Sequence, residues 1–242
     1  MAIELLLASL LSASGPMVHA AQPPGAAEAD WLYFHRDQGA NLEKSLAALD
    51  DLLAKHPVEA GLLWRKGRGL VRLGERQPAD KAKLELYERA KALLGLAVES
   101  SPGDAEAHFW LGIAMGRYGE TRGIVKSLFL VGPMRREMRT VLRLDPNHGG
   151  AHHVLGEMLM RLPAFAGGSK TAAVKEFEDA VRLSPRHAVG YLSLARAYAA
   201  VGRKEKAVEA LGRLLAMKDS DDPAELADNL SEGRALLKEL RP

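Results

Sequence analysis

No cysteine occurs in the 242-residue chain, and aromatic residues make up only 5% of it. The lack of cysteine excludes disulfides, thiolate zinc sites, cysteine nucleophiles and iron–sulfur ligation. The scarcity of aromatic residues, in a chain whose apolar residues are mostly Leu and Ala, favours packed helices over a β-sandwich. Neither charge is in excess, with 33 Lys and Arg against 31 Asp and Glu. The composition therefore gives no reason to expect nucleic acid as a partner.

Motifs of enzymes and metal sites are also missing. The sequence contains no G-x-S-x-G and no H-E-x-x-H, and its Gly167-Gly168-Ser169-Lys170 run lacks the spaced glycine of a phosphate-binding loop. We interpret this run as a linker into a helix capped by Ser169. His148 and His152 could share a helix face, but no carboxylate stands at a matching position and His153 adds no further ligand spacing. We therefore expect no catalytic residues, no cofactor and no metal site.

A hydrophobic run long enough to span a bilayer is absent as well. The apolar stretch Ile3 to Leu11 is too short for that, and Val18-His19-Ala20 follows it as a small-x-small cleavage pattern. We predict that residues 1–20 are a signal peptide, which places the protein in the periplasm or outside the cell with no membrane span after processing. Glu4 and the missing basic residues at the amino end leave a false leader and a cytoplasmic location as the alternative.

What the sequence does contain is a repeat. Four prolines, each after an apolar-periodic stretch, share a common pattern downstream: a small residue ten positions on, a large one at thirteen and a helix breaker at seventeen. The prolines are Pro57, Pro102, Pro146 and Pro185, and the breakers are Gly74, Gly119, Pro163 and Gly202. A small residue on one helix allows a second helix to approach closely. Each unit is therefore predicted to be helix, break, helix.

This pattern resembles the tetratricopeptide repeat. The family's signature is matched by Leu111-Gly112-x₂-Met115, by Leu194-Ala195-x₂-Tyr198 and by Ala173-x₃-Phe177 before Pro185. The resemblance implies an all-α solenoid, a right-handed superhelix of about four antiparallel helix pairs with irregular insertions. We expect a linker at 21–26, the repeat domain at 27–218 and a carboxy-terminal capping helix within 219–242.

A narrower resemblance lies in the middle of the chain. Gly119 to Phe129, followed by Leu144 to Gly156, resembles a group that includes periplasmic components associated with TRAP transporters and the regulators of microtubule dynamics. The first relationship implies a periplasmic accessory protein that contacts a transporter component or holds a small apolar or anionic solute. The second implies a cytoskeletal regulator.

The repeat register predicts which residues face the concave side. Residues seven, eleven and fifteen positions after each proline are expected there, and three arginines at the last offset should form a column that can pair with carboxylates. A merely solvated face is the alternative. The expected partner-binding residues are Trp64, Arg68, Arg72, Phe109, Ile113, Arg117, His153, Glu157, Arg161 and Arg196.

Extra residues after the breakers fall at 75–80, 120–132 and 164–169, which places them all at one end of the solenoid. The middle insertion is unusually apolar for a loop. Its side chains Ile124, Leu128, Phe129 and Leu130 are expected either to pack into the core or to line a cavity or partner contact. As a whole, the sequence predicts a non-enzymatic scaffold that holds a segment of another protein in its concave groove.

Overall fold

The computed structural model describes residues 25–241, except for the side chains of residues 124–126. The predicted leader, residues 1–20, and most of the predicted linker lie outside this range. Between residues 25 and 241 the chain forms eleven α-helices and one 3₁₀ turn, with no strand. The elements are α1 Ala26–Phe34, α2 Asn41–Lys55, α3 Ala60–Glu75, α4 Asp80–Ser100, α5 Ala105–Arg122, α6 Ile124–Leu144, α7 Gly149–Arg161, η1 Ala164–Ala166, α8 Lys170–Leu183, α9 Ala188–Ala200, α10 Lys204–Leu215 and α11 Pro223–Leu240.

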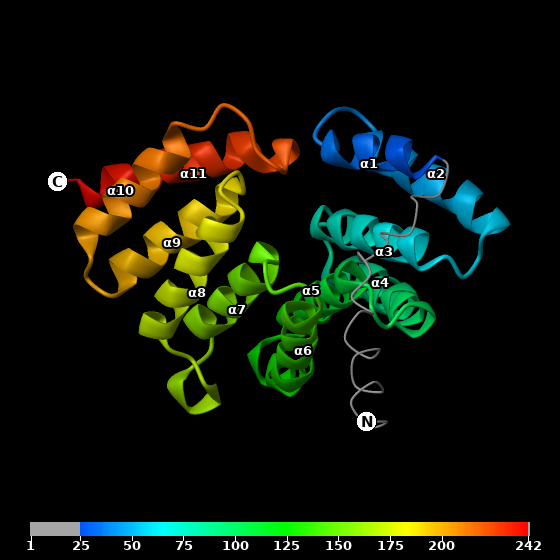
Figure 1. The fold of residues 1–242 in the computed structure, drawn as a ribbon, viewed down its shortest axis with the longest axis horizontal. Helices are drawn as coiled ribbons and strands as arrows, with labels where there is room; N and C mark the ends of the chain where they lie inside the picture. The colour runs from blue at the N-terminus through cyan, green and yellow to red at the C-terminus, as the bar shows by residue number, and fades with distance from the viewer. Residues whose placement is uncertain (1–24, 242) are drawn as a thin grey trace, which may run out of the picture.

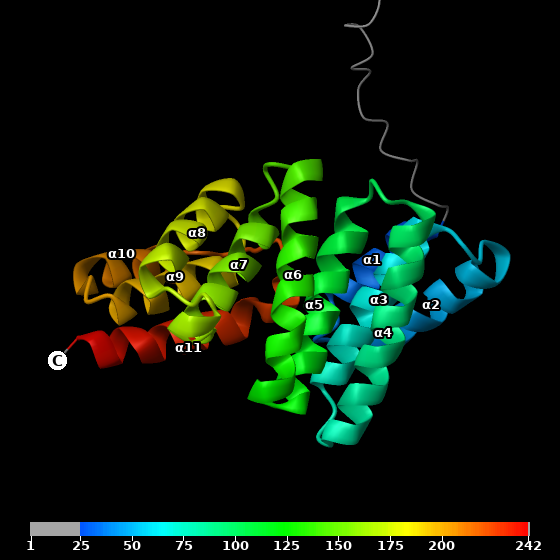
Figure 2. The same ribbon diagram turned by 90° about the horizontal axis from the view of Figure 1, so that it is seen from below.

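The helices form a curved solenoid of five antiparallel pairs followed by α11 (Figure 1). The first helices of the pairs, α1, α3, α5, α7 and α9, line the inner side of the curve together with α11, and the second helices lie outside (Figure 1). Figure 2 shows the long helices α5 and α6 side by side in the middle of the molecule. The all-α solenoid class is thereby confirmed. Among the described helices, we find none with the length and hydropathy needed to cross a bilayer.

The proline pattern marks the ends of the outer helices. Helices α2, α4, α6 and α8 end at Lys55, Ser100, Leu144 and Leu183, each two residues before one of the four prolines. Proline cannot continue a helix because it lacks an N–H and disfavours helical geometry in the residue before it. The fifth pair, α9 and α10, has no such proline, which explains why the sequence pattern predicts only about four pairs.

Glycines at the predicted position allow the paired helices to approach closely. A methyl group added to Gly156 would lie 2.7 Å from the ring of Phe177, and one added to Gly112 would lie 2.4 Å from the end of Met138. Both large residues are buried, and they belong to outer helices. The small-to-large contact between the helices of a pair is thus the packing that the repeat pattern predicts.

Two predictions about the middle unit are wrong. Gly119 does not end the first helix, because α5 continues to Arg122 and Gly123 provides the break with a φ of 90°. The apolar segment after it is not a loop insertion, because it forms the first turns of α6, which continues through Pro133. Leu128 and Leu130 are half-buried, whereas Phe129 is 80% exposed and does not join the core. The side chain of Ile124 lies outside the described residues.

The two ends of the solenoid meet. Arg36, in the turn between α1 and α2, binds Asp222 at 2.7 Å and Glu225 at 2.8 Å at the amino end of α11. Figure 1 shows this end of α11 beside α1. Helix α11 therefore joins the first helix pair to the last pair across the curve.

Candidate functional site

The arginines of the predicted column lie on the inner surface, and carboxylates join them into a ladder. Glu75 bridges the first two: its two oxygens lie 2.9 Å from Arg72 and 2.7 Å from Arg117. Glu120 bridges the second and third, 3.0 Å from Arg117 and 2.8 Å from Arg161. Each bridge thus joins the carboxy-terminal turns of neighbouring inner helices, α3 to α5 and α5 to α7. We refer to Arg72, Glu75, Arg117, Glu120, Arg161 and Glu157 as the inner ladder.

Helical spacing explains the ladder. Each of the first two arginines has its glutamate three residues later, on the same face of its helix, where it also reaches the next inner helix. In α7 the order is reversed, and Glu157 lies four residues before Arg161 at 3.0 Å. Arg72 and Arg161 also lie in the last turns of their helices, where the helix dipole favours positive charge.

The charges of the ladder stabilise one another. Burial by itself would raise the pKa of the Glu75 carboxyl, but Arg72 and Arg117 outweigh this effect and lower the pKa below its usual value. Burial also opposes the charged form of Arg117, yet Glu75 and Glu120 raise its pKa above the ordinary arginine value. Glu75 and Arg117 are therefore both charged at neutral pH.

A histidine cluster adjoins the ladder. Nε2 of His153 lies 3.1 Å from Oγ of Ser193, and this hydroxyl donates a hydrogen bond of 2.8 Å to Glu157. Because Ser193 gives its proton to the carboxylate, Nε2 of His153 must be the donor to Oγ. Burial and the neighbouring His187 lower the pKa of His153 to about 4, so this imidazole is neutral at pH 7. Ser193 is also buried, so this trio does not form an activated nucleophile.

Two of the predicted partner-binding residues belong to the core. Trp64 is 8% exposed and Arg68 is 6% exposed. Arg68 binds Asp30 at 2.6 Å and stacks 3.6 Å above the ring of Tyr33. Arg65 binds the same aspartate at 2.8 Å. These residues tie α1 to α3 and leave little surface for a partner.

The other predicted residues are spread along the inner helices. Phe109 is half-buried, with its ring centroid 4.7 Å from that of His148, and Ile113 packs against two of the apolar clusters. Arg196 on α9 is half-exposed and binds Glu232 of α11 at 2.5 Å. Helix α11 therefore packs against α9 at the last pair.

Sequence reasoning missed Asp222 and Glu225. Besides Arg36, Glu225 binds Arg72 at 2.9 Å, so α11 extends the ladder back to α3. Asp222 followed by proline indicates the start of a helix, and nothing in the local sequence indicates that this carboxylate contacts a residue of the first pair. In the structure its side chain makes no capping bond to α11.

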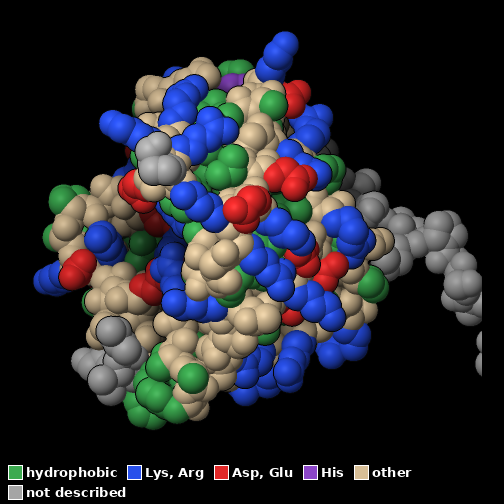
Figure 3. All heavy atoms as spheres, turned by 90° about the vertical axis from the view of Figure 1, so that its left-hand side faces the viewer, with side chains coloured by type: hydrophobic (Ala, Val, Ile, Leu, Met, Phe, Trp, Pro, Cys, Tyr) green, Lys and Arg blue, Asp and Glu red, His purple; other side chains and the backbone are tan. Residues whose placement is uncertain are grey.

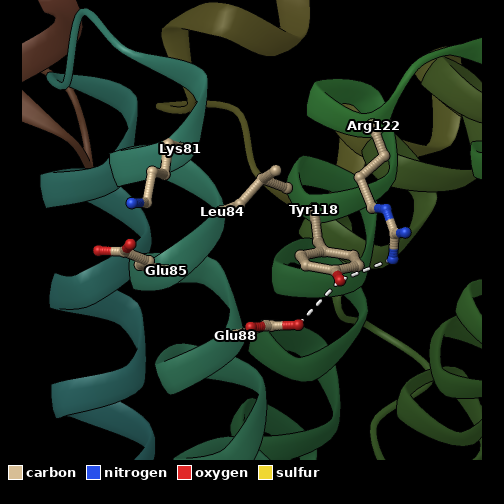
Figure 4. Close-up of a pocket in the computed structure, with 6 residues that line it drawn as sticks. All are labelled: Lys81, Leu84, Glu85, Glu88, Tyr118 and Arg122. Carbon is tan, nitrogen blue, oxygen red and sulfur yellow. Dashed lines mark hydrogen bonds between the residues drawn. The ribbon is translucent and has the colours of Figure 1, made fainter.

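The outer surface carries a shallow groove of about 630 Å³ between α4 and α5. Figure 4 shows its lining, in which the Tyr118 hydroxyl donates to Glu88 at 2.9 Å and accepts from Arg122 at 2.8 Å. These side chains satisfy one another. Within residues 25–241 we find no group of three or more His, Asp and Glu side chains arranged to hold a metal ion.

The fold and the repeat pattern define a protein of the tetratricopeptide type. Residues 164–223 match a family model of the tetratricopeptide repeat, and such repeats are in general modules that bind other proteins rather than catalysts. Residues 27–162 match the model of the family described as regulator of microtubule dynamics protein 1-3. Because this match covers more than half of the chain, the chain belongs to that family. No curated protein matches it.

Solved structures of tetratricopeptide repeat proteins are similar to this one. MamA residues 41 to the end, from Desulfovibrio magneticus RS-1, is 15% identical with a TM-score of 0.48, over 81% of this chain and 96% of that one. TTC0263, a thermophilic protein of Thermus thermophilus, is 26% identical with a TM-score of 0.46, over 73% and 92%. YrrB, described as having an unusual peptide-binding site, is 20% identical with a TM-score of 0.44, over 83% and 88%.

Proposed function

We propose that the protein is a non-enzymatic scaffold that binds an extended, carboxylate-bearing segment of another protein in its inner groove. The segment lies against α5 and α7, where Arg117 and Arg161 provide the contacts. The observation that carries this proposal is an imbalance in the polar contacts of the inner ladder.

Every carboxylate oxygen of Glu75 and Glu120 lies within 3.0 Å of an arginine nitrogen. Arg117 and Arg161, in contrast, use only Nε and one terminal nitrogen each, and Nη2 of both makes no bond to any described residue. A guanidinium carries five N–H donors. The ladder therefore has spare guanidinium donors on Arg117 and Arg161, while Oε1 of Glu75 makes an ion contact with Arg117 but no hydrogen bond. Backbone carbonyls and carboxylates are the peptide groups that such donors bind.

The ladder also exchanges its partners at little cost. Arg117 is 39% exposed and Arg161 is 62% exposed, although both lie on the inner side of the curve. Ion pairs exposed to this degree contribute roughly 0–1 kcal/mol. A bound segment can thus replace Glu120 or Glu157 as the partner of an arginine with a small loss of intramolecular stability.

The test is binding of labelled acidic peptides to Arg117→Ala and Arg161→Ala variants. Each substitution is expected to weaken binding roughly ten- to a hundredfold, since a charge-assisted pair contributes about 1.5–3 kcal/mol. The matched control is Arg213→Ala on the outer helix α10, because Arg213 makes an equivalent ion pair with Glu209 at 2.9 Å and is 65% exposed. Equal affinities of all three variants and the unmodified protein would contradict the proposal.

We further propose that the protein works outside the cytoplasm. The support is the sequence pattern of residues 1–20. Expression in the source cell, followed by mass determination of the purified chain, tests this: a chain that begins at residue 21 is expected. A chain that retains residues 1–20 would favour the cytoplasmic alternative.

A second candidate is a role in microtubule dynamics, which the family's name suggests for this chain. If it is correct, the purified protein sediments with polymerised tubulin, and Arg117→Ala together with Arg161→Ala reduces this binding. If the protein does not sediment with tubulin, this candidate is wrong. If it sediments and the double substitution leaves the binding unchanged, tubulin binds to a surface other than the inner groove.

A further inference from the structure

Helix α6 carries four arginines that no carboxylate neutralises. They are Arg135, Arg136, Arg139 and Arg143, and none of them forms an ion pair with another described residue, although Arg143 donates to the hydroxyl of Thr140 at 3.2 Å. The helix has one acidic residue, Glu137, which faces α5 and binds His108 at 2.6 Å. Lys and Arg side chains are also frequent on the outer face shown in Figure 3. The arginines of α6 differ from these side chains because two of them, Arg135 and Arg139, line a cleft.

The cleft lies between α6 and the helices that follow it, and it has a volume of about 290 Å³. Arg135 and Arg139 stand on one side, and Leu155, Met158 and Leu159 of α7 form an apolar floor. Gly167, after η1, closes one end, and a methyl group added there would lie 3.2 Å from Nη2 of Arg135. The loop therefore passes directly over this guanidinium.

Two further features make the cleft suited to an acidic, partly apolar ligand. Its one acidic lining residue, Glu176, has Oε2 2.8 Å from Nδ1 of His152, so one oxygen of this carboxylate is engaged within the protein. Phe165, on the loop that ends at Gly167, is 85% exposed. Exposed aromatic rings and arginines are both enriched in protein contact sites.

We propose that this cleft is a second interaction site, which binds an acidic amphipathic helix of a partner protein. Arg135, Arg139 and Arg143 follow one another at intervals of four residues and so form a row about 12 Å long. A helix with carboxylates at the same interval matches this row. Its neighbouring stripe of apolar residues covers the floor of the cleft and the ring of Phe165. The site is separate from the inner groove, since α6 is an outer helix.

The experiment uses the purified full chain and a labelled helical peptide of about 16 residues. The peptide has Glu at three successive i, i+4 positions and Leu on the adjacent stripe. Fluorescence anisotropy is expected to show saturable binding that weakens as salt is added. A peptide with Lys in place of Glu is expected not to bind. If the Lys peptide binds equally well, the proposal is wrong.

Variants locate the site. Arg135→Gln with Arg139→Gln is expected to weaken binding at least about tenfold, and Phe165→Ala a few-fold. Lys204→Gln with Arg213→Gln on α10 removes the same charge from another outer helix and should change little. Arg117→Ala with Arg161→Ala leaves this binding intact, so a failure of the inner groove and a failure of the cleft give different results. Binding to phosphatidylcholine vesicles with about 20% phosphatidylserine, without binding of the Glu peptide, would overturn the proposal.

Discussion

Gly156 tests the close packing of paired helices at the scale of one residue. Alanine is the better helix former by about 1 kcal/mol. Its methyl group, however, would lie 2.7–2.9 Å from three ring atoms of Phe177, which is 1% exposed and cannot move away. Overpacking of this kind costs about 1–3 kcal/mol. We predict that Gly156→Ala lowers the free energy of unfolding by about 1–2 kcal/mol in urea denaturation.

The control for this prediction is Gly95→Ala. Gly95 lies inside α4, and an added methyl group there meets no atom within 4 Å. This substitution should raise the free energy of unfolding by about 0.5–1 kcal/mol. If both variants were stabilised, the close approach of α7 and α8 would not be the reason for the glycine.

His153 predicts a dependence of stability on pH. Its pKa is about 4 in the folded protein against an ordinary value of 6.5. As the pH falls below 6.5, the unfolded chain binds a proton that the folded chain does not, so stability decreases down to about pH 4. The decrease from this residue amounts to roughly 2 kcal/mol between pH 7 and pH 5. We predict that His153→Gln, which can still bond to Ser193, loses less stability than the unmodified protein over this range.

Urea denaturation at pH 7 and pH 5 measures this difference. His56→Gln is the control, because His56 is exposed in the turn after α2. An identical loss of stability in His153→Gln and the unmodified protein would show that the buried imidazole does not cause the pH dependence.

At the scale of the helix, α11 is held to the first pair by a buried ion pair. Arg36 is 5% exposed and Asp222 is 13% exposed. Loss of the aspartate leaves Arg36 with Glu225 as its one remaining carboxylate partner among the described residues. Breaking a buried pair costs about 3–5 kcal/mol when no partner remains. We therefore predict a smaller loss, about 1–3 kcal/mol, for Asp222→Ala.

Thermal and urea denaturation of Asp222→Ala test this value against Asp228→Ala. Asp228 lies on the same helix, is exposed and forms no ion pair with a described residue. A loss in Asp222→Ala no larger than that of the control would mean that α11 is held by its apolar contacts with α9 and α10 alone.

The helices differ in how well the sequence predicts them. The ends of α2, α4, α6 and α8 follow from proline, whose effect on the backbone is local. The beginning of α6 could not be predicted in this way, because Gly132-Pro133 indicates a break within a loop. Proline in a helix costs least where water can reach the carbonyl left without a partner. The first part of α6 lies at the surface, where Phe129 is 80% exposed.

The candidate site could be predicted only in part, because some of its contacts follow from local sequence spacing and others do not. The offsets after each proline place Arg72, Arg117 and Arg161 in one column, and the structure brings them together. The glutamates that bridge them could be found from the same helical spacing, since Glu75 and Glu120 each follow an arginine by three residues. Asp222 could not be found in this way, because its contact with Arg36 depends on the curvature accumulated over five helix pairs.

At the scale of the whole molecule, a small number of charged side chains holds the two ends of the solenoid together. The ion pairs of Arg36 and Arg72 with Asp222 and Glu225 join the first half of the chain to α11 across the open side of the curve. A solenoid repeat contacts mainly its neighbours in sequence, so its curvature is sensitive to such a contact between ends. The groove should therefore widen when these pairs are removed.

A distance measurement across this junction tests the idea. The chain has no cysteine, so Gln38→Cys and Lys218→Cys, both at exposed positions, can be labelled without side reactions. We predict one narrow distance distribution by double electron–electron resonance in the otherwise unmodified protein. Arg36→Ala with Asp222→Ala should give a longer and broader distribution, whereas Arg213→Ala should change nothing. An unchanged distribution in the double variant would show that the curvature is set by the packing of successive helix pairs and not by the ion pairs between the ends.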